Sequence, residues 1–150
     1  MNELLIRKMN TADIPVVAEV FVNAYSDVPW CENWSREDAI VRVTDYFHYP
    51  NSRCYVALYQ NTIVGGILCD VLRWHKGKQI EIKELFVSPN MQKKGIGKAL
   101  FYRMENDAID EGIGEIIFWT DIHPKMQSFY TGMGCKISQG EVIMHKKIIN

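Results

Sequence analysis

The sequence predicts an α/β or α+β sandwich in which helices flank a mixed β-sheet. Strand-like and helix-like segments follow one another in the order β-α-α-β-β-β-α-β-α-β-β, which is typical of that class. The polar pair Gln60-Asn61 separates two apolar runs, as a hairpin turn does. A loop rich in Gly and Lys, residues 92–98, follows the apolar run 85–87 and opens an amphipathic helix.

The chain is expected to begin with a strand and two helices. Residues 4–8 are strand-like, and apolar side chains at helical spacing predict a helix over 11–25. A loop over 27–34 follows. Ser35, with an aspartate three residues later, resembles a capping box and predicts the start of a second helix, which Pro50 prevents from continuing.

The rest of the chain alternates between strands and helices. The expected strands are 54–59, 62–68, 79–87 and 115–120, with a final strand pair over 135–148. The helix that opens after the Gly and Lys loop ends at Gly112, and a short helix is predicted over 124–133.

Composition narrows the class of protein. The chain has 150 residues, 47% of them hydrophobic, and this favours a single domain over 1–150 with its own core. The net charge is −1, so nucleic acid is not an expected partner. No segment approaches the roughly 20 apolar residues of a membrane span, and the N-terminus lacks the layout of a signal peptide. We therefore expect a cytoplasmic protein. The cysteines and histidines show no metal-ligand spacing, so no metal is expected.

The loop that opens the predicted helix has features of a phosphate-binding site. Helix N-termini carry free N–H groups and partial positive charge, and glycine lets a phosphate approach the backbone. A P-loop would need Gly at position 92 and Ser or Thr at 99, where this chain has Gln92 and Ala99. A Rossmann loop would need a small residue at position 100, which is Leu100. A surface turn that only caps the helix is the plainer alternative.

Two segments carry a family resemblance. The loop matches Gln/Arg-x-x-Gly-x-Gly/Ala at every defined position, and it follows the run Glu-Leu-Phe-Val-Ser-Pro at 84–89. Residues 128–135 resemble Phe-Tyr-x-x-x-Gly-Phe, with Cys135 in place of the last Phe. In these motifs and in the order of its elements, the chain resembles the GNAT superfamily of N-acetyltransferases. The loop around Pro29 and Trp30 is similar to a bacterial, aminoglycoside 6′-N-acetyltransferase-like branch.

The resemblance implies a mostly antiparallel sheet that splays open in the middle to admit coenzyme A. It implies acetyl transfer from acetyl-CoA to a primary amine of a small molecule that is aminoglycoside-, polyamine- or amino-acid-like. It also implies a homodimer through the C-terminal strands. The residues expected to bind acetyl-CoA are Leu85, Phe86, Val87, Gln92, Lys93, Lys94, Gly95, Ile96, Gly97, Lys98 and His123.

Acetyl transfer to an amine needs a base and a proton for the departing thiolate. Glu81 and Glu84 are the candidate bases. Strict alternation puts them on opposite faces of a strand, although a bulge would alter this. Glu84 is favoured, because burial in its apolar stretch would raise its pKa. By resemblance, Tyr130 is the candidate acid, and Phe129 beside it is expected to be the core residue.

The sequence says less about the site for the acceptor than about the site for acetyl-CoA. Trp30, Trp34 and Trp74 are expected to form an aromatic wall, although a lone tryptophan is more often part of a core. Asp27 is expected to add negative charge for the acceptor, with Glu32 and Asp70. Two alternatives stay open: a protein or peptide acetyltransferase, and a non-catalytic acyl-CoA sensor.

Overall fold

A computed structural model describes residues 3–149. The chain forms two compact units, one that ends at Phe118 and one that begins at Trp119. The first unit holds the whole sheet and three of the helices described below, and the second holds one short helix.

The sheet of the first unit has five strands in the order of the sequence. These are β1 (Leu4–Lys8), β2 (Ser52–Tyr59), β3 (Thr62–Trp74), β4 (Gly77–Val87) and β5 (Glu115–Ile117). Neighbours from β1 to β4 are antiparallel, and β5 lies parallel to β4. The predicted mixed, mostly antiparallel sheet is therefore confirmed.

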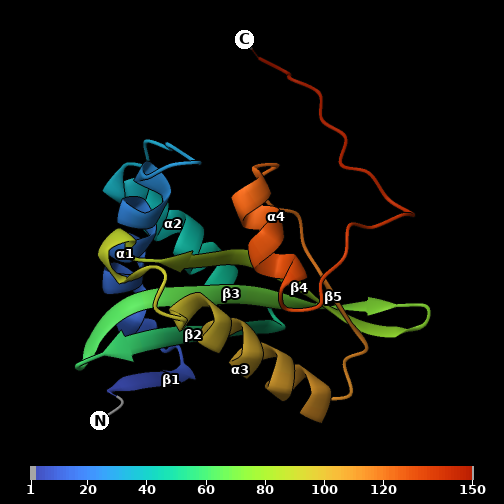
Figure 1. Cartoon of the computed structure of the whole chain (residues 1–150), viewed down its shortest axis with the longest axis horizontal. Helices are drawn as coiled ribbons and strands as arrows, with labels where there is room; N and C mark the ends of the chain where they lie inside the picture. Colours follow the sequence, from blue (N-terminus) through green and yellow to red (C-terminus); the bar gives the residue numbers. More distant parts are fainter. Residues whose placement is uncertain (1–2, 150) are drawn as a thin grey trace. The chain divides into compact units, whose positions relative to one another are not determined.

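Helices cover both faces of this sheet (Figure 1). Helices α1 (Ile14–Ser26) and α2 (Arg36–Phe47) lie on one face, and α3 (Ile96–Asp110) crosses the other. The core under α1 and α2 includes Val56, Leu68 and Phe86. The largest fully buried side chains also include Tyr55, Ile67, Leu100, Phe101 and Met104.

Local interactions explain where the first two helices begin. The Ser35 hydroxyl accepts a hydrogen bond from the backbone N–H of Asp38 at 3.0 Å, which confirms the predicted cap of α2. A short 3-10 helix, η1 (Thr11–Asp13), precedes α1. Two guanidinium nitrogens of Arg7 donate to the buried Asp13 carboxylate at 2.8 and 3.0 Å, and thereby join β1 to this turn.

Strands β2, β3 and β4 form a meander with two irregularities. Gln60 and Asn61 both have positive φ, 49° and 62°, as the predicted two-residue hairpin turn requires. One bulge interrupts the β2–β3 pairing beside Leu58, and a second, at Lys83, interrupts the β3–β4 pairing. A Cβ added at Gly65 would lie 2.8 Å from the Phe86 carbonyl oxygen, so glycine lets β3 and β4 approach there.

The second unit contains the helix α4 (Pro124–Thr131), and no strand is assigned to its described residues. The prediction of a strand pair over 135–148 is therefore wrong. The Ser138 hydroxyl bonds instead to the Glu141 carboxylate and to the Gly140 N–H, a local turn that competes with a strand ladder. Among the described residues, no helix has the length and apolar character needed to cross a membrane.

Candidate active site

The Gly and Lys loop lies between β4 and the N-terminus of α3. A second 3-10 helix, η2 (Pro89–Met91), precedes it, and Gly95 is the N-cap of α3 with a φ of 82°. No side chain among the described residues caps this helix, so its first N–H groups are free to bind an anion. Ile96 is buried and anchors the first turn, whereas Gly97 beside it is half-buried.

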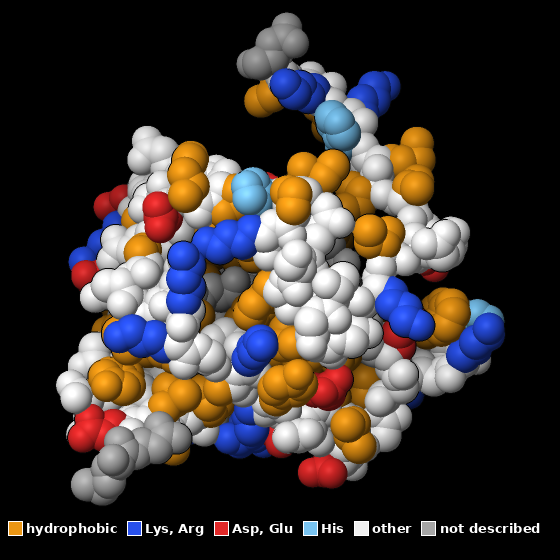
Figure 2. All heavy atoms as spheres, viewed as in Figure 1, with side chains coloured by type: hydrophobic (Ala, Val, Ile, Leu, Met, Phe, Trp, Pro, Cys, Tyr) orange, Lys and Arg blue, Asp and Glu red, His pale blue; other side chains and the backbone are white. Residues whose placement is uncertain are grey.

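Side chains of the loop fall into two groups. Gln92 Nε2 donates to the Val87 carbonyl oxygen at 3.2 Å, which ties the loop to the end of β4. Lys93, Lys94 and Lys98 are exposed, and no ion pair in the described part of the chain involves them. Figure 2 shows Lys and Arg side chains on the face where α3 begins. The loop therefore combines free N–H donors with uncompensated positive charge.

Strand β4 has a free edge directly before this loop. Its pairing with β5 ends at Glu81, which lies opposite Ile117. From Ile82 to Val87 it pairs with β3 alone, and no other strand of the described chain lies on its second edge. Phe86 is buried on this stretch, whereas Leu85 and Val87 are half-buried. An edge without a strand partner is the kind of edge to which an extended ligand adds as a further strand.

Glu84 is a buried carboxylate on this same stretch of β4. Only 8% of it is exposed, and its Oε1 accepts from Arg42 Nε at 3.1 Å and from Arg42 Nη2 at 2.9 Å. Burial raises the pKa of Glu84 above its ordinary value, and the Arg42 cation offsets part of that rise. The hydroxyl of Tyr25 from α1 lies close by and donates to the Leu85 carbonyl oxygen at 3.4 Å.

The bulge brings both candidate bases to one face. Leu68 pairs with Glu84 and Cys69 with Ile82, so Lys83 is the extra residue. Lys83 Nζ lies 2.6 Å from Glu81 Oε1 and 5.8 Å from the ring centroid of Tyr49, which follows α2 in the chain. Glu81 therefore lies on the α2 side of the sheet, as Glu84 does. Strict alternation would have separated them.

Aromatic rings enclose the Arg42 guanidinium, whose carbon lies 5.0 Å from the centroid of Trp34 and 5.2 Å from that of Tyr46. Trp34 also packs edge-on against Phe21 at 5.1 Å. Its indole N–H donates to the Glu32 carboxylate at 2.6 Å. Trp34 is thus both part of the core and a wall beside Glu84.

The structure does not gather all three candidate tryptophans. Trp30 packs against Tyr25 at 5.2 Å, near Trp34. Trp74 pairs with Gly77 at the end of the β3–β4 hairpin and is 45% exposed. It lies six residues along β3 from Leu68, the partner of Glu84, or about 20 Å at the rise of a strand. Trp74 therefore lies away from the other two.

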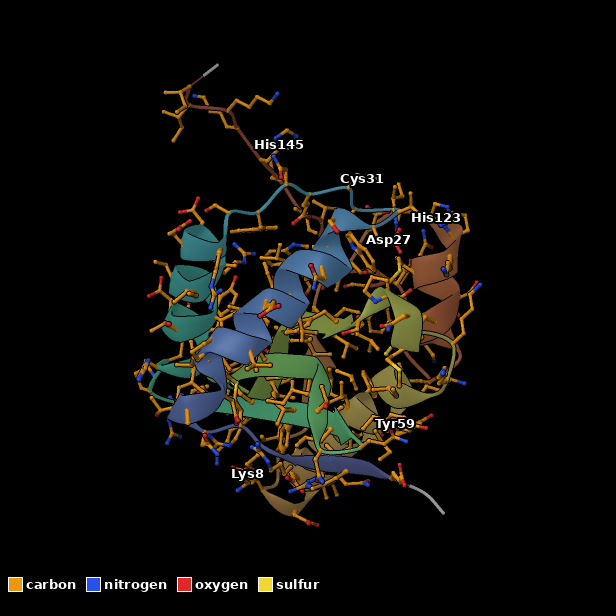
Figure 3. All side chains as sticks on the ribbon, turned by 90° about the vertical axis from the view of Figure 1, so that its left-hand side faces the viewer. Lys8, Asp27, Cys31, Tyr59, His123 and His145 are labelled. Carbon is orange, nitrogen blue, oxygen red and sulfur yellow. The ribbon has the colours of Figure 1, made fainter. Side chains whose placement is uncertain are left out.

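The carboxylates proposed for the acceptor have different surroundings. Asp27 shapes the turn after α1, because its Oδ1 accepts from the Val28 N–H and its carbonyl from the Cys31 N–H, both at 2.9 Å. Figure 3 shows Asp27 and Cys31 near the C-terminal end of α1, away from Lys8 on β1. Asp70 lies opposite Glu81, and its Oδ1 is buried without a hydrogen-bond partner among the described residues.

The second unit holds the two remaining candidates. Tyr130 of α4 is buried and Phe129 is half-buried, the reverse of the expected order. Their rings meet edge-on at 5.0 Å. The His123 Nδ1 accepts the Lys125 N–H at 3.1 Å and so caps α4, which is a structural role for this side chain.

Sequence reasoning missed Arg42, although a signal for it exists. Ala39 and Val43 form the buried stripe of α2, and Arg42 and Tyr46 continue that stripe at helical spacing. An arginine in a buried stripe and a glutamate in an apolar strand are both costly unless they are paired. That shared anomaly points to an ion pair.

The sequence pattern of the acetyltransferase (GNAT) family matches residues 18–135. The chain therefore belongs to this family and is an acetyltransferase. No protein of curated function has a significantly similar sequence.

Solved structures share the fold at low sequence identity. A possible acetyltransferase from Clostridium difficile 630 has a TM-score of 0.82 and 15% identity, over 97% of this chain and 99% of that one. An aminoglycoside acetyltransferase, meta-AAC0020 from an uncultured soil metagenomic sample, has a TM-score of 0.73 and 20% identity, over 99% and 97%. The aminoglycoside N-acetyltransferase AAC(6′)-Iy, in complex with CoA, has a TM-score of 0.79 and 14% identity, over 99% and 97%.

Proposed function

We propose that this chain transfers an acetyl group from acetyl-CoA to a primary amine of a small molecule. The observation that carries the proposal is the buried Glu84 on the free edge of β4, directly before an uncapped helix N-terminus flanked by exposed lysines. A base, an edge for an extended ligand and an anion site are thus adjacent along one stretch of chain.

The residues present fit coenzyme A. The free N–H groups at the start of α3 suit a pyrophosphate, and no Cβ at Gly95 stands between it and the backbone. Lys93, Lys94 and Lys98 add attraction for phosphate. The backbone of Leu85 to Val87 suits the pantetheine arm, because that edge of β4 has no strand partner in the described chain. Acetyl-CoA, when bound, supplies the thioester that the acceptor amine attacks.

The chain's own groups then serve the transfer. The backbone N–H of Leu85 is proposed to donate to the thioester carbonyl oxygen, on which negative charge develops. Glu84 is proposed to take the proton of the acceptor ammonium, directly or through water, because burial has raised its pKa towards that of a useful base. Glu81, whose carboxylate pairs with Lys83 as that of Glu84 pairs with Arg42, is the second candidate.

Tyr130 is proposed to donate its hydroxyl proton to the departing thiolate. A phenol is an effective acid for a thiolate when its hydroxyl lies within hydrogen-bond reach of the sulfur. His123 is proposed only as a contact to the pantetheine arm, beside its role as the cap of α4. The family match spans both compact units, which supports the proposal that 1–150 acts as a single catalytic domain.

The acceptor is proposed to enter between α2 and the free stretch of β4, beside Trp34 and Arg42. Two structurally similar proteins are described as aminoglycoside acetyltransferases, which favours a small amine over a peptide. A homodimer and a cytoplasmic location remain predictions. The oligomeric state can be measured by light scattering.

The test is a calorimetric titration with CoA, followed by an acetyl-CoA assay over polyamines, aminoglycosides, amino acids and a peptide panel. We expect CoA to bind and at least one small amine to release free thiol. Failure to bind CoA would end the proposal. CoA binding without turnover on any acceptor would instead support a sensor, and turnover on peptides alone would support a protein acetyltransferase.

A further inference from the structure

The Arg42 guanidinium is held in one place by three neighbours. Two of its nitrogens donate to the same oxygen of Glu84, and the rings of Trp34 and Tyr46 lie over it. Arginine between aromatic rings loses little further side-chain entropy when it binds a ligand. Arg42 is therefore preorganised beside the proposed base.

The Arg42 guanidinium also has N–H groups that are not used by Glu84, and part of the side chain is exposed to solvent. Arg42 Nη1 makes no hydrogen bond within the described chain, and 39% of the side chain is exposed, against 8% for Glu84. Arg42 thus lies between Glu84 and solvent. A ligand that approaches Glu84 from the α2 side meets the positive charge first. A planar fork with free N–H groups is the usual partner of a carboxylate.

The other charges on this face differ from Arg42. Lys83 is paired with Glu81 at 2.6 Å, and only about a fifth of its side chain is exposed. Asp70, opposite Glu81, keeps a buried oxygen without a hydrogen-bond partner in the described chain and would favour a cation instead. Asp70 therefore favours an acceptor with a second positive charge, whereas Arg42 favours one with a negative charge. Of these two residues, Arg42 is the one that contacts Glu84.

We propose that Arg42 binds a carboxylate of the acceptor, so that the substrate is an amine that also carries a carboxylate, as an amino acid does. This inference rests on the proposed acetyl transfer at Glu84 and narrows its acceptor class. Arg42 is the specificity-determining residue of that class. A polyamine lacks the carboxylate and brings only positive charge towards the guanidinium.

The same contact would couple acceptor binding to the base. The titratable and charged groups that face Glu84 are Arg42 and Tyr46 from α2, Tyr25 from α1 and Glu32 from the intervening loop. Arg42 is the cation among them. An acceptor carboxylate bound at Nη1 offsets part of the Arg42 charge, so the buried Glu84 has a weaker counter-charge and becomes a better proton acceptor as the substrate arrives.

The experiment compares acceptors that differ in the carboxylate alone: lysine with cadaverine, ornithine with putrescine, and phenylalanine with phenethylamine. Acetylation and equilibrium binding to the CoA-saturated protein are both measured. For at least one pair we expect the amino acid to be preferred in kcat/KM by about tenfold or more, as for loss of a charge-assisted hydrogen bond. Arg42→Gln should abolish this preference, and Arg42→Lys should restore part of it.

Arg73→Gln is the matched control, since Arg73 is an exposed arginine near the end of the β3–β4 hairpin that forms no ion pair among the described residues. It should keep the preference. If CoA binds and the amines are acetylated as well as their amino acids or better, or if Arg42→Gln leaves the ratio unchanged, the inference is overturned while acetyl transfer stands. If CoA does not bind, the proposed function fails. The same pairs are then titrated into the protein alone, and equal binding of amine and amino acid would overturn the inference as well. If an Arg42 variant fails to fold, the wild-type ratio of kcat/KM between each amino acid and its amine still tests the inference.

Discussion

Replacing Glu84 with glutamine separates the catalytic role of this side chain from its structural role. The amide keeps an oxygen that can accept from Arg42, but it cannot take a proton. Because the change removes a buried charge and weakens its partner bond together, we expect stability to change by only about 1 kcal/mol. Loss of a general base lowers the rate by about 100- to 10,000-fold, or roughly 3–5 kcal/mol of barrier.

The assay is the pH dependence of kcat/KM with acetyl-CoA and a responsive amine. In the wild type the rate should fall as pH drops through the raised pKa of Glu84, because the protonated carboxyl cannot accept a proton. Glu84→Gln should lose this acidic limb along with most of the rate. Glu81→Gln is the control and should keep the limb. An unchanged limb in Glu84→Gln would refute the assignment and transfer the role to Glu81 or to water.

Three further predictions address the loop, the scaffold and the acid. Gly95→Ala should weaken CoA binding about tenfold in calorimetry, since a left-handed alanine costs about 1–2 kcal/mol. Gly77→Ala, also at a positive φ but at the β3–β4 turn, should leave CoA binding unchanged, and equal CoA affinities of the two variants would contradict the loop assignment. Asp13→Asn should lower the free energy of unfolding by about 2 kcal/mol at neutral pH. Arg7 lowers the pKa of Asp13 in the folded protein. This contribution to stability is therefore present above the pKa that Asp13 has in the unfolded chain, and it is lost as pH falls through the pKa of the folded protein. Equal stability of the variant and the wild type in a urea titration at neutral pH would contradict this prediction. Tyr130→Phe should lower kcat about 100-fold with KM little changed, and an unaltered kcat would remove the tyrosine from the reaction.

Much of the scaffold follows from local rules in the sequence. The Ser35 cap, the Gln60-Asn61 turn and the helix that opens at the Gly and Lys loop each express a preference of a few neighbouring residues, and all three are present in the structure. The prediction of a strand pair over 135–148 was wrong because a strand needs a partner strand, and a pattern of apolar residues in the sequence does not supply one.

The parts of the site that could be predicted are those whose residues are close together in the sequence. Glu84 and the loop after it lie on one segment, and the burial expected of Glu84 is confirmed. The bulge at Lys83, which brings Glu81 to the same face, arises from pairing with β3 and leaves no local mark. Arg42 is 42 positions away from Glu84, so only the anomaly of two charges in apolar patterns could have linked them.

The most direct test of acetyl transfer at Glu84 is a crystal structure with CoA and a bound acceptor. We expect the pyrophosphate on the N–H groups at the start of α3, within hydrogen-bond distance of about 3 Å. We expect the pantetheine arm along the free edge of β4 and the acceptor amine within reach of Glu84, directly or through one water. CoA bound elsewhere, or an acceptor amine remote from Glu84, would contradict it.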